Sequence, residues 1–519
     1  MDRPPRTLLA ALLVALAACA SRSPASAPGG GATEPVGETS PLPDRPWQDE
    51  IIYFVLVDRF ADGDPANDAD AKPGEPGAFH GGDLRGLTQQ LDEIATLGAT
   101  AIWVNPLVQN IKGFVSGAGF PDWAYHGYWA DDYTRLDPRF GTDEELRTFV
   151  EAAHGRGIRV LLDVVYNHPG YDSHFAFDRA TRYWVRSGMN GQCGEDDLTT
   201  CLAGLPDWKT ELPEVSRFLM DAQLRWAKRF GLDGYRLDTV KHVDHPFWRE
   251  HRARTRAELQ PGFFLLGEVW GGDRDVLAPY FEGDELDAGF DFGFQGNALG
   301  WAMGRGRTVA FERYLETRHR VPEGHWLSHF LSSHDVTGGL QLAAGDRAVF
   351  RLAAALQLTT MGIPTIFYGE EVARPIGEWP LNRTDMPWGD RRILPGAGGA
   401  RDEAMRAYYQ RLIAIRRAHP ALSRGTHEAL SVEGDVLAFA RRDRGDAVVV
   451  VLNRGSQEAT LQVGVPQEWA STNPSELLMG GPITLTDGAL HLSIPPRTAR
   501  IVGMAEAAPE RSRSGMNGG

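Results

Sequence analysis

Residues 143–168 read DEELRTFVEAAHGRGIRVLLDVVYNH and contain one copy of the pattern that decides the fold. The first half, 143–156, has apolar residues at helical spacing and is predicted to be an α-helix. The second half contains the apolar, β-branched run 157–164, which is predicted to be a buried strand. Polar residues that include Asn167 and His168 follow this strand. A helix that leads into such a strand is typical of parallel α/β folds.

The same alternation extends through most of the chain, with helical stretches such as 214–230 and 347–360 between apolar runs. Seven further runs are predicted strands: 51–57, 99–104, 234–237, 263–266, 288–292, 329–332 and 363–368. Eight strands that alternate with helices predict a (β/α)8 TIM barrel, which we place at 47–424. The long gap after the third strand, 169–213, is predicted to be an inserted subdomain.

After residue 424 the pattern changes to short apolar runs separated by Gly, Asn and Asp. This change predicts a C-terminal antiparallel β-sandwich domain at 425–503. Its expected strands are 436–441, 447–453, 459–463 and 489–494. The remaining residues, 504–519, are polar and are expected to form a disordered tail.

The composition excludes several classes of protein. The 519 residues are 42% hydrophobic, which is typical of a soluble globular protein and not of a polytopic membrane protein or a disordered chain. A net charge of −16 argues against a nucleic-acid partner. Fourteen tryptophans suggest a ligand with flat amphipathic faces, such as a sugar, although core packing accounts for many aromatic residues.

The N-terminal segment has the features of a targeting sequence. Arg3 and Arg6 precede an apolar run, 8–16, that is too short to span a bilayer. Small residues then lead to Cys19, a pattern that resembles the lipobox of bacterial lipoproteins. We therefore expect residues 1–19 to be a lipoprotein signal that ends at a lipidated Cys19, with a plain secretory signal as the alternative. Residues 20–46 are Ser/Pro/Ala/Gly-rich and read as a flexible linker. The protein is thus expected to be exported and anchored in the bacterial cell envelope, at the outer membrane or the periplasmic face.

Polar residues follow several of the predicted barrel strands. Barrel enzymes carry their chemistry at the carboxyl ends of the strands, so these residues are candidates for an active site. They are Asp58, Asn105, Asp163, Asn167, His168, Arg236, Asp238, Glu268, His334 and Asp335. A single carboxylate at a strand end is commonly a helix cap. The combination of several acids with an arginine and two histidines points instead to catalysis.

Four ordered motifs resemble those of glycoside hydrolase family 13, the α-amylase family. They are DVVYNH at 163–168, GYRLDTVKH at 234–242, GEVW at 267–270 and FLSSHD at 330–335. GLPDW at 204–208 and GIPTIFYGE at 362–370 agree, and the resemblance covers about 47–500. Some features depart from the family pattern: LPDWK at 205–209 replaces a more usual ending in Leu-Asn, and the 382–388 segment lacks its usual upstream Asp in register. Ser333 stands where Asn is common, as in the neopullulanase and cyclomaltodextrinase group, and that group's N-terminal β domain is absent.

The resemblance implies a catalytic trio. Cleavage of a glycosidic bond with retention needs one carboxylate as nucleophile and one protonated carboxyl as acid. The matching positions are Asp238 for the nucleophile, Glu268 for the acid/base, and Asp335 for the carboxylate that binds the distorted sugar. Arg236 lies on the same strand face as Asp238 and is expected to keep it ionised, whereas Glu268 needs a less stabilised environment to stay protonated.

The resemblance also implies a set of sugar-binding residues. These are His126, Tyr128, Trp129, His168, Arg236, Lys241, His242, His334 and Arg383. The segment YHGYW at 125–129 resembles the family segment whose tyrosine stacks on glucose, with a packed aromatic cluster as the alternative. Lys241 and His242 match the pair that contacts the sugar on the leaving-group side in enzymes that act on α-1,4 bonds. Arg383 belongs to a segment, 382–388, that resembles a substrate loop.

Two Ca²⁺ sites are expected. The first uses oxygen ligands at short spacing in the loop DGDPAND, at 62–68, and in GGD at 81–83. Its candidate ligands are Asp62, Asp64, Asn67, Asp68, Gly81 and Asp83. This loop resembles the N-terminal calcium loop of cyclodextrin glycosyltransferases, and a solvated Asp/Gly turn is the alternative. By the resemblance, the second site joins Asn167, Asp207 and the carbonyl of His242, and its ion is expected to be structural.

Cys193 and Cys201 lie eight residues apart inside the predicted insertion. In an exported protein they are expected to form a disulfide. A zinc site is the weaker alternative, because no His or further Cys lies close by.

The expected function is retaining hydrolysis of α-1,4-glucosidic bonds in starch, maltodextrins or related α-glucans. One alternative is a transglycosylase or an enzyme of the cyclomaltodextrinase and neopullulanase type. Another is a surface glycan-binding protein without activity. The presence of all three acids, Asp238, Glu268 and Asp335, argues against this alternative. The expected partner is an α-glucan or maltooligosaccharide, membrane contact is expected through the anchor alone, and the chain is expected to be a monomer.

Overall fold

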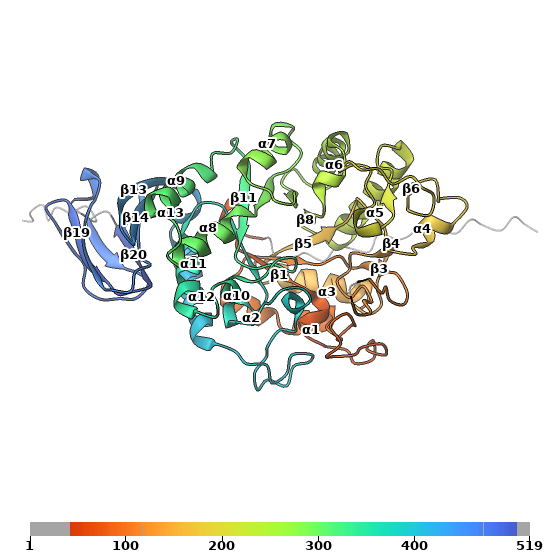
Figure 1. The fold of residues 1–519 in the computed structure, drawn as a ribbon, viewed down its shortest axis with the longest axis horizontal. Helices are drawn as coiled ribbons and strands as arrows, with labels where there is room; N and C mark the ends of the chain where they lie inside the picture. The colour runs from red at the N-terminus through yellow and green to blue at the C-terminus, as the bar shows by residue number, and fades with distance from the viewer. Residues whose placement is uncertain (1–41, 118, 471, 506–519) are drawn as a thin grey trace, which may run out of the picture. The chain divides into compact units, whose positions relative to one another are not determined.

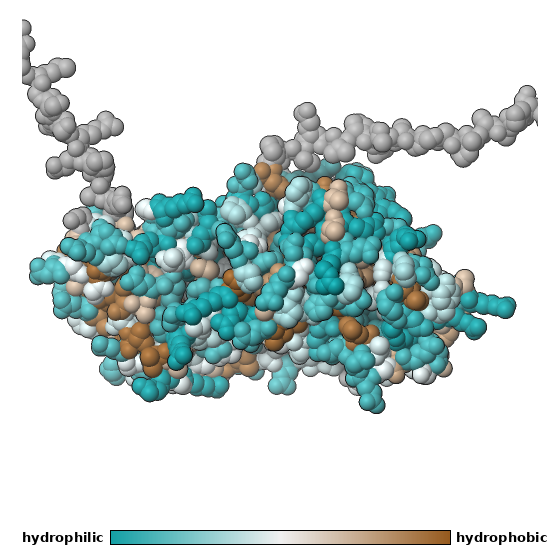
Figure 2. Space-filling view, turned by 90° about the horizontal axis from the view of Figure 1, so that it is seen from above, coloured by the Kyte–Doolittle hydropathy of each residue, from teal (hydrophilic) through white to brown (hydrophobic). Residues whose placement is uncertain are grey.

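The computed structural model describes residues 42–117, 119–470 and 472–505. The expected signal peptide with Cys19, most of the 20–46 linker and most of the 504–519 tail lie outside the described residues. Among the described helices, none combines the length and apolar character needed to cross a bilayer. On the face drawn in Figure 2, hydrophilic residues cover most of the surface and apolar residues occur in small separate patches.

Eight parallel strands close into a barrel, and helices surround it (Figure 1). In chain order the strands are β1 (Ile52–Val55), β2 (Ala101–Val104), β5 (Arg159–Val164), β8 (Gly234–Leu237), β9 (Phe264–Gly267), β10 (Ala288–Asp291), β11 (Trp326–Phe330) and β12 (Ile363–Phe367). Each strand pairs with its neighbour along the chain, and β12 pairs with β1 to close the ring. The predicted TIM barrel is therefore confirmed.

Most barrel strands lie within one or two residues of their predicted bounds, and β11 differs most from its prediction. The structure begins β11 at Trp326 and ends it at Phe330, whereas the sequence suggested 329–332. Pairing with β10 explains the shift, because Trp326 lies opposite Ala288 at the start of that strand. The Ser-Ser-His-Asp segment that follows is thus a loop at the rim and not part of the strand.

The outer helices begin and end at recognisable signals. Helix α3 (Asp143–His154) starts with a capping box in which Thr142 and Glu145 satisfy each other's backbone N–H groups. Helix α5 (Pro213–Phe230) starts at a proline and stops at Gly231, whose φ of 69° is left-handed. The other helices of the barrel layer are α1 (Leu84–Gln89), α2 (Leu91–Leu97), α6 (His245–Glu258), α7 (Arg274–Glu282), α8 (Gly293–Ala302), α9 (Thr308–Arg318), α10 (Gly339–Leu342), α11 (Arg347–Thr359) and α12 (Glu403–Ala418).

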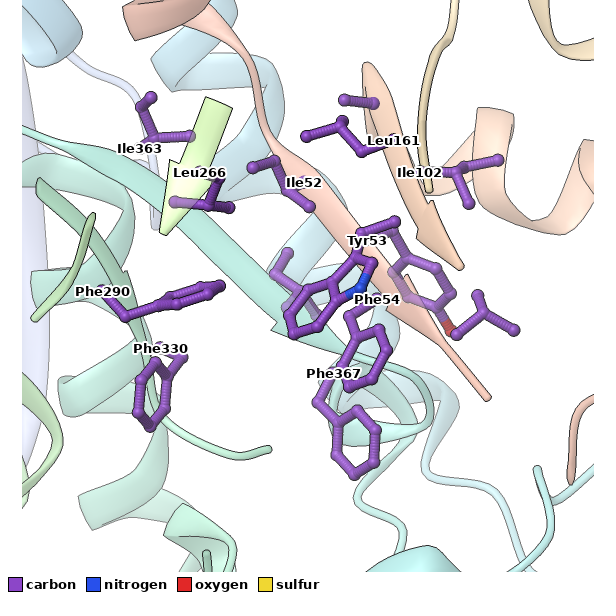
Figure 3. Packing of buried hydrophobic residues seen from close by; sticks show 14 of the residues in the cluster. Ile52, Tyr53, Phe54, Ile102, Leu161, Leu266, Phe290, Phe330, Ile363 and Phe367 are labelled. Carbon is purple, nitrogen blue, oxygen red and sulfur yellow. The ribbon is translucent and has the colours of Figure 1, made fainter. Parts of the chain in front are cut away.

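Aromatic residues fill the barrel interior below the rim (Figure 3). Phe54 stacks on Trp103 with ring centroids 3.5 Å apart, and Phe367 stacks on the same phenylalanine at 5.2 Å. Phe290 of β10 and Phe330 of β11 pack against each other nearby. Burial of each such ring stabilises the fold by roughly 1.5–3 kcal/mol. This layer forms a rigid apolar floor beneath the polar residues of the rim.

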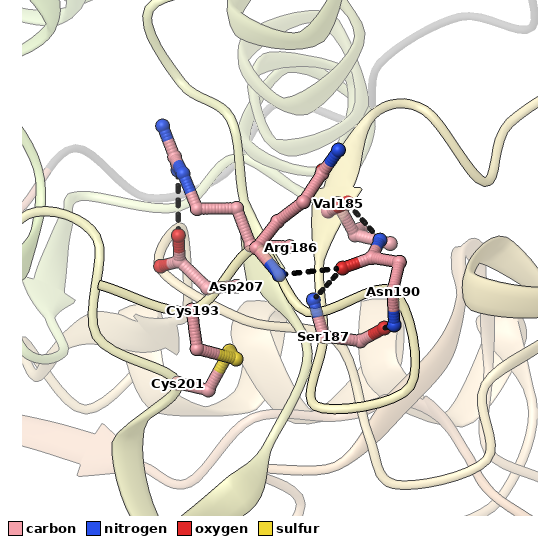
Figure 4. The surroundings of a disulfide bond; sticks show 8 residues. Val185, Arg186, Ser187, Asn190, Cys193, Cys201 and Asp207 are labelled. Atoms are coloured by element: carbon pink, nitrogen blue, oxygen red, sulfur yellow. Dashed lines mark hydrogen bonds and ion pairs between the residues drawn. A yellow bond between two sulfur atoms is a disulfide. The ribbon is translucent and has the colours of Figure 1, made fainter.

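The predicted insertion appears between β5 and α5. It contains α4 (His174–Phe177), β6 (Val185–Arg186), the short 3-10 helix η3 (Leu202–Gly204) and β7 (Asp207–Trp208). Cys193 and Cys201 form the expected disulfide, with Cα atoms 5.3 Å apart (Figure 4). A second excursion, the hairpin of β3 (Val108–Asn110) and β4 (Ala130–Leu136), was not predicted. The two excursions meet where Trp208 donates to the Tyr133 hydroxyl over 3.0 Å.

The C-terminal domain consists of two antiparallel sheets with a shared core, as predicted. One sheet contains β13 (Thr426–Glu433), β14 (Val436–Asp443), β15 (Asp446–Asn453), β20 (Thr498–Ala505) and β17 (Asn473–Glu476). The other contains β16 (Ala459–Gly464), β19 (Ala489–Ile494) and β18 (Thr484–Thr486). The sequence did not predict β13, β17, β18 or β20, and β20 runs past the expected boundary at 503. After helix α13 (Ala421–Arg424), the domain contacts the barrel layer where Arg441 donates to the Thr359 carbonyl over 3.0 Å.

Candidate active site

Three neighbouring barrel strands bring the acidic residues of the rim together. In the register of β5 and β8, Asp163 lies opposite Arg236, and in that of β8 and β9, Leu237 lies opposite Gly267. The residues that follow these two strands, Asp238 and Glu268, therefore emerge side by side. Parallel pairing thus converts positions far apart in the sequence into neighbours.

A buried arginine binds all three of these acids. Nη1 of Arg236 lies 2.6 Å from Asp238 Oδ1 and 3.1 Å from Asp163 Oδ1, and Nη2 lies 3.2 Å from Glu268 Oε1. Burial alone would lower the pKa of Arg236, but Asp163 and Glu268 raise it well above its usual value. The contact with Glu268 was not expected, because the sequence analysis placed the acid/base candidate away from stabilising charge. The guanidinium of Arg236 therefore fixes the positions of the Asp238 and Glu268 carboxyls.

Glu268 is poised to carry a proton. Burial, and next the negative charges of Asp238 and Asp335, raise its pKa to about 8 against the lowering effect of Arg236. A small pocket lined by Phe290 and Phe292 adjoins it, and this apolar wall explains the burial effect. Its Oε2 also accepts from the Thr239 amide over 2.9 Å. The carboxyl is thus protonated at neutral pH and held in a fixed orientation.

Asp335 has the opposite electrostatic environment. Burial would raise its pKa, but the adjacent His334 and the positive charges of Arg383 and Arg236 lower it below its usual value. Its Oδ1 lies 2.8 Å from Arg383 Nη2 and its Oδ2 lies 3.0 Å from His334 Nε2. Burial lowers the pKa of His334 to about 3, so this ring is neutral. Asp335 therefore stays ionised near a protonated Glu268.

The aromatic segment 125–129 both packs and lines the cleft. The Tyr128 ring stacks on His334 with centroids 5.4 Å apart, and its hydroxyl donates to Asp163 Oδ2 over 2.7 Å. Burial lowers the pKa of His126 well below its usual value, and the ring packs edge-on against Trp129 at 4.7 Å. The two interpretations of this segment, a packed cluster and a sugar-facing wall, are compatible in the structure.

A cleft of about 710 Å³ opens above these residues. Most of the residues proposed from the sequence line it: His126, Tyr128, Trp129, His168, Asp238, Lys241, His242, Glu268, His334, Asp335 and Arg383. Arg236 lies beneath the cleft and lines the small pocket instead. Sequence reasoning missed Trp270 and Trp379, which also line the cleft and are 52% and 43% exposed. Trp270 ends the GEVW motif, so its position beside the acid was a usable signal.

The expected calcium loop contains side-chain oxygens without partners. Among the described residues, Asp62 Oδ1, Asn67 Oδ1 and Asp68 Oδ1 are buried and accept no hydrogen bond. Burial, and next the charges of Asp62 and Asp83, raise the pKa of Asp68 to about 7. Gly81 has a φ of 101°, and a Cβ there would lie only 2.7 Å from Asp68 Oδ1. The loop thus concentrates oxygen atoms and negative charge with little compensation.

Two members of this expected ligand set have other partners. Asp64 pairs with Arg85 over 3.0 Å. Asp83 caps helix α1 by accepting from Gly86 N over 2.7 Å and also accepts from the amides of Gly63 and Asp64. Within 42–117, 119–470 and 472–505, no group of three or more His, Cys, Asp or Glu side chains is arranged to hold a metal. A cation in this loop would therefore depend on amide and carbonyl oxygens as well as carboxylates.

At the second expected calcium site, hydrogen bonds among the protein groups can satisfy the expected ligands without an ion. One terminal atom of the Asn167 amide lies 3.1 Å from both Asp207 Oδ1 and the His242 carbonyl oxygen. With the amide nitrogen in that position, both acceptors receive a hydrogen bond. With the amide oxygen there, three oxygens converge as around a cation. Asp207 also binds Arg186 Nη1 over 2.6 Å, so part of its charge is already neutralised.

A closed parallel barrel with acids gathered at the carboxyl ends of its strands defines a TIM-barrel enzyme. Residues 54–192 and 189–385 match the model of the alpha amylase catalytic domain. Residues 427–501 match the maltogenic amylase C-terminal domain. The chain therefore belongs to the α-amylase family, glycoside hydrolase family 13, and is an α-amylase-type glycoside hydrolase.

Named relatives agree with this assignment. A cyclomaltodextrinase of Geobacillus thermopakistaniensis is 30% identical, and the match covers 86% of this chain and 76% of the relative. A periplasmic alpha-amylase of Escherichia coli is 31% identical, with 78% and 72% covered. The crystal structure of an alpha-amylase from Geobacillus thermoleovorans complexed with acarbose is 30% identical, has a TM-score of 0.76, and is matched over 90% of this chain and 100% of that one.

Proposed function

We propose that this chain hydrolyses α-1,4-glucosidic bonds in starch, maltodextrins or related α-glucans by double displacement with retention. The observation that carries the proposal is the shared guanidinium, because Arg236 binds both Asp238 and Glu268. Carboxyls on one guanidinium lie close together, and retaining enzymes need a short separation of roughly 5–5.5 Å. The raised pKa of Glu268 also keeps this residue protonated at neutral pH, as the acid of such an enzyme must be.

In the first step Asp238 acts as the nucleophile. Its carboxylate forms a bond to the anomeric carbon while the bond from that carbon to the glycosidic oxygen breaks. Glu268 donates its proton to that oxygen, so the leaving sugar departs as a neutral hydroxyl. Ionised Asp335 and the neutral ring of His334 bind the hydroxyls of the distorted sugar. The negative charge of Asp335 also stabilises the positive charge that develops on the sugar ring.

In the second step a water molecule replaces the leaving sugar. Glu268, now ionised, removes a proton from the water as its oxygen bonds to the anomeric carbon. The bond between that carbon and Asp238 breaks, and both carboxyls return to their starting states. Arg236 remains bound to both throughout, so neither moves far between the steps.

Residues on the leaving-group side support a preference for α-1,4 bonds. Lys241 and His242 line the cleft with Glu268, in the positions that the family motif gives to enzymes of this specificity. Trp270, which follows Glu268, offers a flat apolar face to a further glucose unit. The solved relative in complex with acarbose and the two relatives named as an amylase and a cyclomaltodextrinase support an α-glucan substrate.

A second candidate is a transglycosylase or an enzyme of the cyclomaltodextrinase and neopullulanase type. It is favoured by the match of 427–501 to a maltogenic amylase domain and by the cyclomaltodextrinase among the relatives. All of these enzymes use the same covalent intermediate. A transglycosylase transfers the glycosyl group to a sugar and not to water, whereas an enzyme of the cyclomaltodextrinase type differs in the substrate that it prefers. A glycan-binding protein without activity is disfavoured, because all three acids are present in the cleft and the pKa of Glu268 is raised whereas that of Asp335 is lowered.

Product analysis distinguishes these candidates. The purified full-length chain is incubated separately with maltoheptaose, cyclodextrin and pullulan, and the products are separated by size. We expect short linear maltooligosaccharides from maltoheptaose. Products that are mainly longer or cyclic would contradict the hydrolase assignment and favour transglycosylation. A preference for cyclodextrin over maltoheptaose would favour the cyclomaltodextrinase type.

We also propose that Ca²⁺ binds the loop that contains Asp62, Asn67 and Asp68. The three buried oxygens without partners fit the preference of this ion for oxygen ligands. The ion would be structural, since it would neutralise carboxylates and fix the loop that precedes helix α1. A second Ca²⁺ among Asn167, Asp207 and the His242 carbonyl is also proposed, with weaker support, because hydrogen bonds can satisfy those groups.

Finally, we propose that the chain is exported and anchored through lipid on Cys19, and that it acts as a monomer. The basic residues, the short apolar run and the small residues before Cys19 support this proposal. Cys19→Ala in a bacterial host should move the protein from the membrane fraction to the soluble fraction. Equal membrane retention of both forms would contradict lipidation, and size-exclusion chromatography with light scattering tests the monomer.

A further inference from the structure

The disulfide closes a short loop, 193–201, which we call the disulfide loop (Figure 4). Hydrogen bonds within the loop limit its motion further. Asp196 Oδ1 accepts from the Leu198 amide and from the Thr199 hydroxyl, each over 2.9 Å. Gly194 N donates to the Thr199 carbonyl over 2.8 Å. A loop with a covalent closure and its own hydrogen bonds can hold a side chain in a defined place.

This loop is attached to the active-site rim. His242 Nδ1 lies 2.7 Å from the carbonyl oxygen of Asp197, and because a carbonyl can only accept, Nδ1 is the donor. The carboxylate of the same residue lies 3.4 Å from Lys241 Nζ. One residue of the disulfide loop thus engages both members of the Lys241–His242 pair.

The contact lies on the leaving-group side of the cleft. Asp197 and Lys241 line the same cleft as Glu268, the residue proposed to protonate the leaving oxygen. Glu268 is itself held by the amide of Thr239, only two residues before Lys241. The side chains of Asp197 and Lys241 are 62% and 32% exposed, so a ligand can reach both.

We infer that Asp197 and Lys241 act together as a binding pair for the glucose unit on the leaving-group side. This inference rests on the proposed function. A carboxylate only accepts hydrogen bonds and an ammonium only donates them, whereas each glucose hydroxyl can do both. Two neighbouring hydroxyls can therefore bridge the pair, one donating to Asp197 and the other accepting from Lys241. Since an exposed ion pair is weak, its charges can adjust to a sugar at little cost.

The disulfide then has a role in specificity. It holds Asp197 against His242, so that its carboxylate stays beside Lys241 while substrates enter and leave. Asp197 becomes a substrate-binding residue that the sequence motifs did not identify. The disulfide acts as a positioning element for it and touches no reacting atom.

Two substrates separate this role from general effects on activity. Maltoheptaose places glucose units on both sides of the broken bond, whereas α-maltosyl fluoride has fluoride as its leaving group and places none there. The measured quantity is the ratio of kcat/KM for maltoheptaose to kcat/KM for the fluoride. In Asp197→Ala we expect this ratio to fall about tenfold through a higher KM, as for the loss of a hydrogen bond to a charged group. Asp197→Asn, which keeps an acceptor oxygen, should recover part of the loss.

A second variant tests the disulfide, and a third serves as the control. Cys193→Ser combined with Cys201→Ser should lower the same ratio, because the loop is no longer held against His242. If that variant does not fold, Asp197→Ala still decides the question. Glu258→Ala, which breaks the exposed Lys228–Glu258 pair, should keep the wild-type ratio.

The outcomes distinguish the inference from the proposed function. An unchanged ratio in Asp197→Ala, or an equal fall in Glu258→Ala, overturns the inference while leaving the proposed function intact. Equal losses on both substrates overturn it too, because they indicate a general structural effect. A wild-type enzyme that turns over neither substrate overturns the proposed function, and the inference with it.

Discussion

Arg236 Nη1 and Asp238 Oδ1 lie 2.6 Å apart, and only 1% and 9% of the two side chains are exposed. The pair packs on the aromatic residues of the barrel interior, and the guanidinium carbon of Arg236 lies 5.0 Å from the centroid of the Trp103 ring. Removal of one partner from such a buried pair leaves the other charge without compensation. The arginine is therefore as important to the fold as to the chemistry.

Replacement of this arginine should destabilise the protein strongly. Arg236→Ala leaves Asp163 and Asp238 buried without a cation, so the free energy of unfolding should fall by about 3–5 kcal/mol. Urea denaturation followed by circular dichroism measures this change. Arg254→Ala breaks the more exposed pairs with Asp221 and Glu258, and it should cost only about 0–1 kcal/mol. Equal losses in the two variants would contradict the assigned importance of Arg236.

Glu268→Gln should abolish most of the activity and leave the fold intact. Glutamine resembles the protonated acid in shape and charge but cannot transfer a proton, so kcat on maltoheptaose should fall by about 10²–10⁴. Starch–iodine clearing gives a rapid readout, and thermal denaturation checks the fold. Glu250→Gln, an exposed acid on helix α6, is the matched control and should clear starch like the wild type. Equal clearing by Glu268→Gln and the wild type would refute the acid/base role.

The pH profile should show the raised pKa of Glu268. The first step needs the protonated acid, so kcat/KM should be retained below the folded-state pKa of about 8 and lost as the pH rises through it. Asp335 must stay ionised, and because its pKa is lowered below the usual value of 3.8, its own protonation should not limit activity above that pH. Initial rates on maltoheptaose across pH measure both limbs. An alkaline limb near the usual glutamate value of 4.5 would contradict the buried environment of Glu268.

The same pKa shift predicts a trend in stability. A group whose pKa is higher in the folded than in the unfolded state binds more protons when folded between those two values. The contribution of Glu268 to the free energy of unfolding is therefore fully present below 4.5 and is lost as the pH rises toward about 8. In Glu268→Gln this part of the pH dependence should disappear. Thermal denaturation at several pH values compares the two proteins, and parallel curves would contradict the assignment.

Removal of Ca²⁺ should lower the thermal stability of the protein, because the ion supports the fold and takes no direct part in the chemistry. A chelator should reduce the unfolding temperature, and added Ca²⁺ should restore it, because a ligand that binds the folded state stabilises it by mass action. Asp68→Asn should remove most of this dependence. In the absence of the ion this variant should be more stable than the wild type, since it relieves repulsion from Asp62 and Asp83. Asp70→Asn, an exposed neighbour, is the control and should respond to Ca²⁺ like the wild type. An unfolding temperature insensitive to Ca²⁺ would contradict the proposed site.

Much of the barrel could be predicted because its signals are local. Fully apolar strands such as Ala101–Val104 and amphipathic helices such as Asp143–His154 carry their periodicity within a few residues. Edge strands of the C-terminal domain could not be found in this way. In β13 (Thr426–Glu433) no residue is fully buried, so hydrogen bonds to β14 define the strand more than its side chains do. The bounds of β11 likewise depended on its partner strand.

The site divides in a similar way. The motifs placed Asp238, Glu268 and Asp335 at strand ends. Because the carboxyl ends of barrel strands meet at one rim, the sequence predicted that these acids would converge. The contact of Arg236 with Glu268 and the position of Trp379 in the cleft could not be predicted, because each depends on how side chains from different strands and loops meet. Asp197 gave no signal of its own and reaches the rim only because the disulfide loop folds back onto η4 (Val240–His242).

The sequence by itself determined the alternation of strands and helices in the barrel, the family and the chemical types of the rim residues, since periodicity and short motifs are properties of neighbouring residues. The tertiary structure decided which acid is protonated, which oxygens in the 62–68 loop lack partners, and which loop borders the leaving-group side. These depend on burial and on distances between residues far apart in the chain, such as Asp197 and His242, 45 positions apart. Desolvation and Coulomb interactions act through space, so only the folded arrangement fixes them.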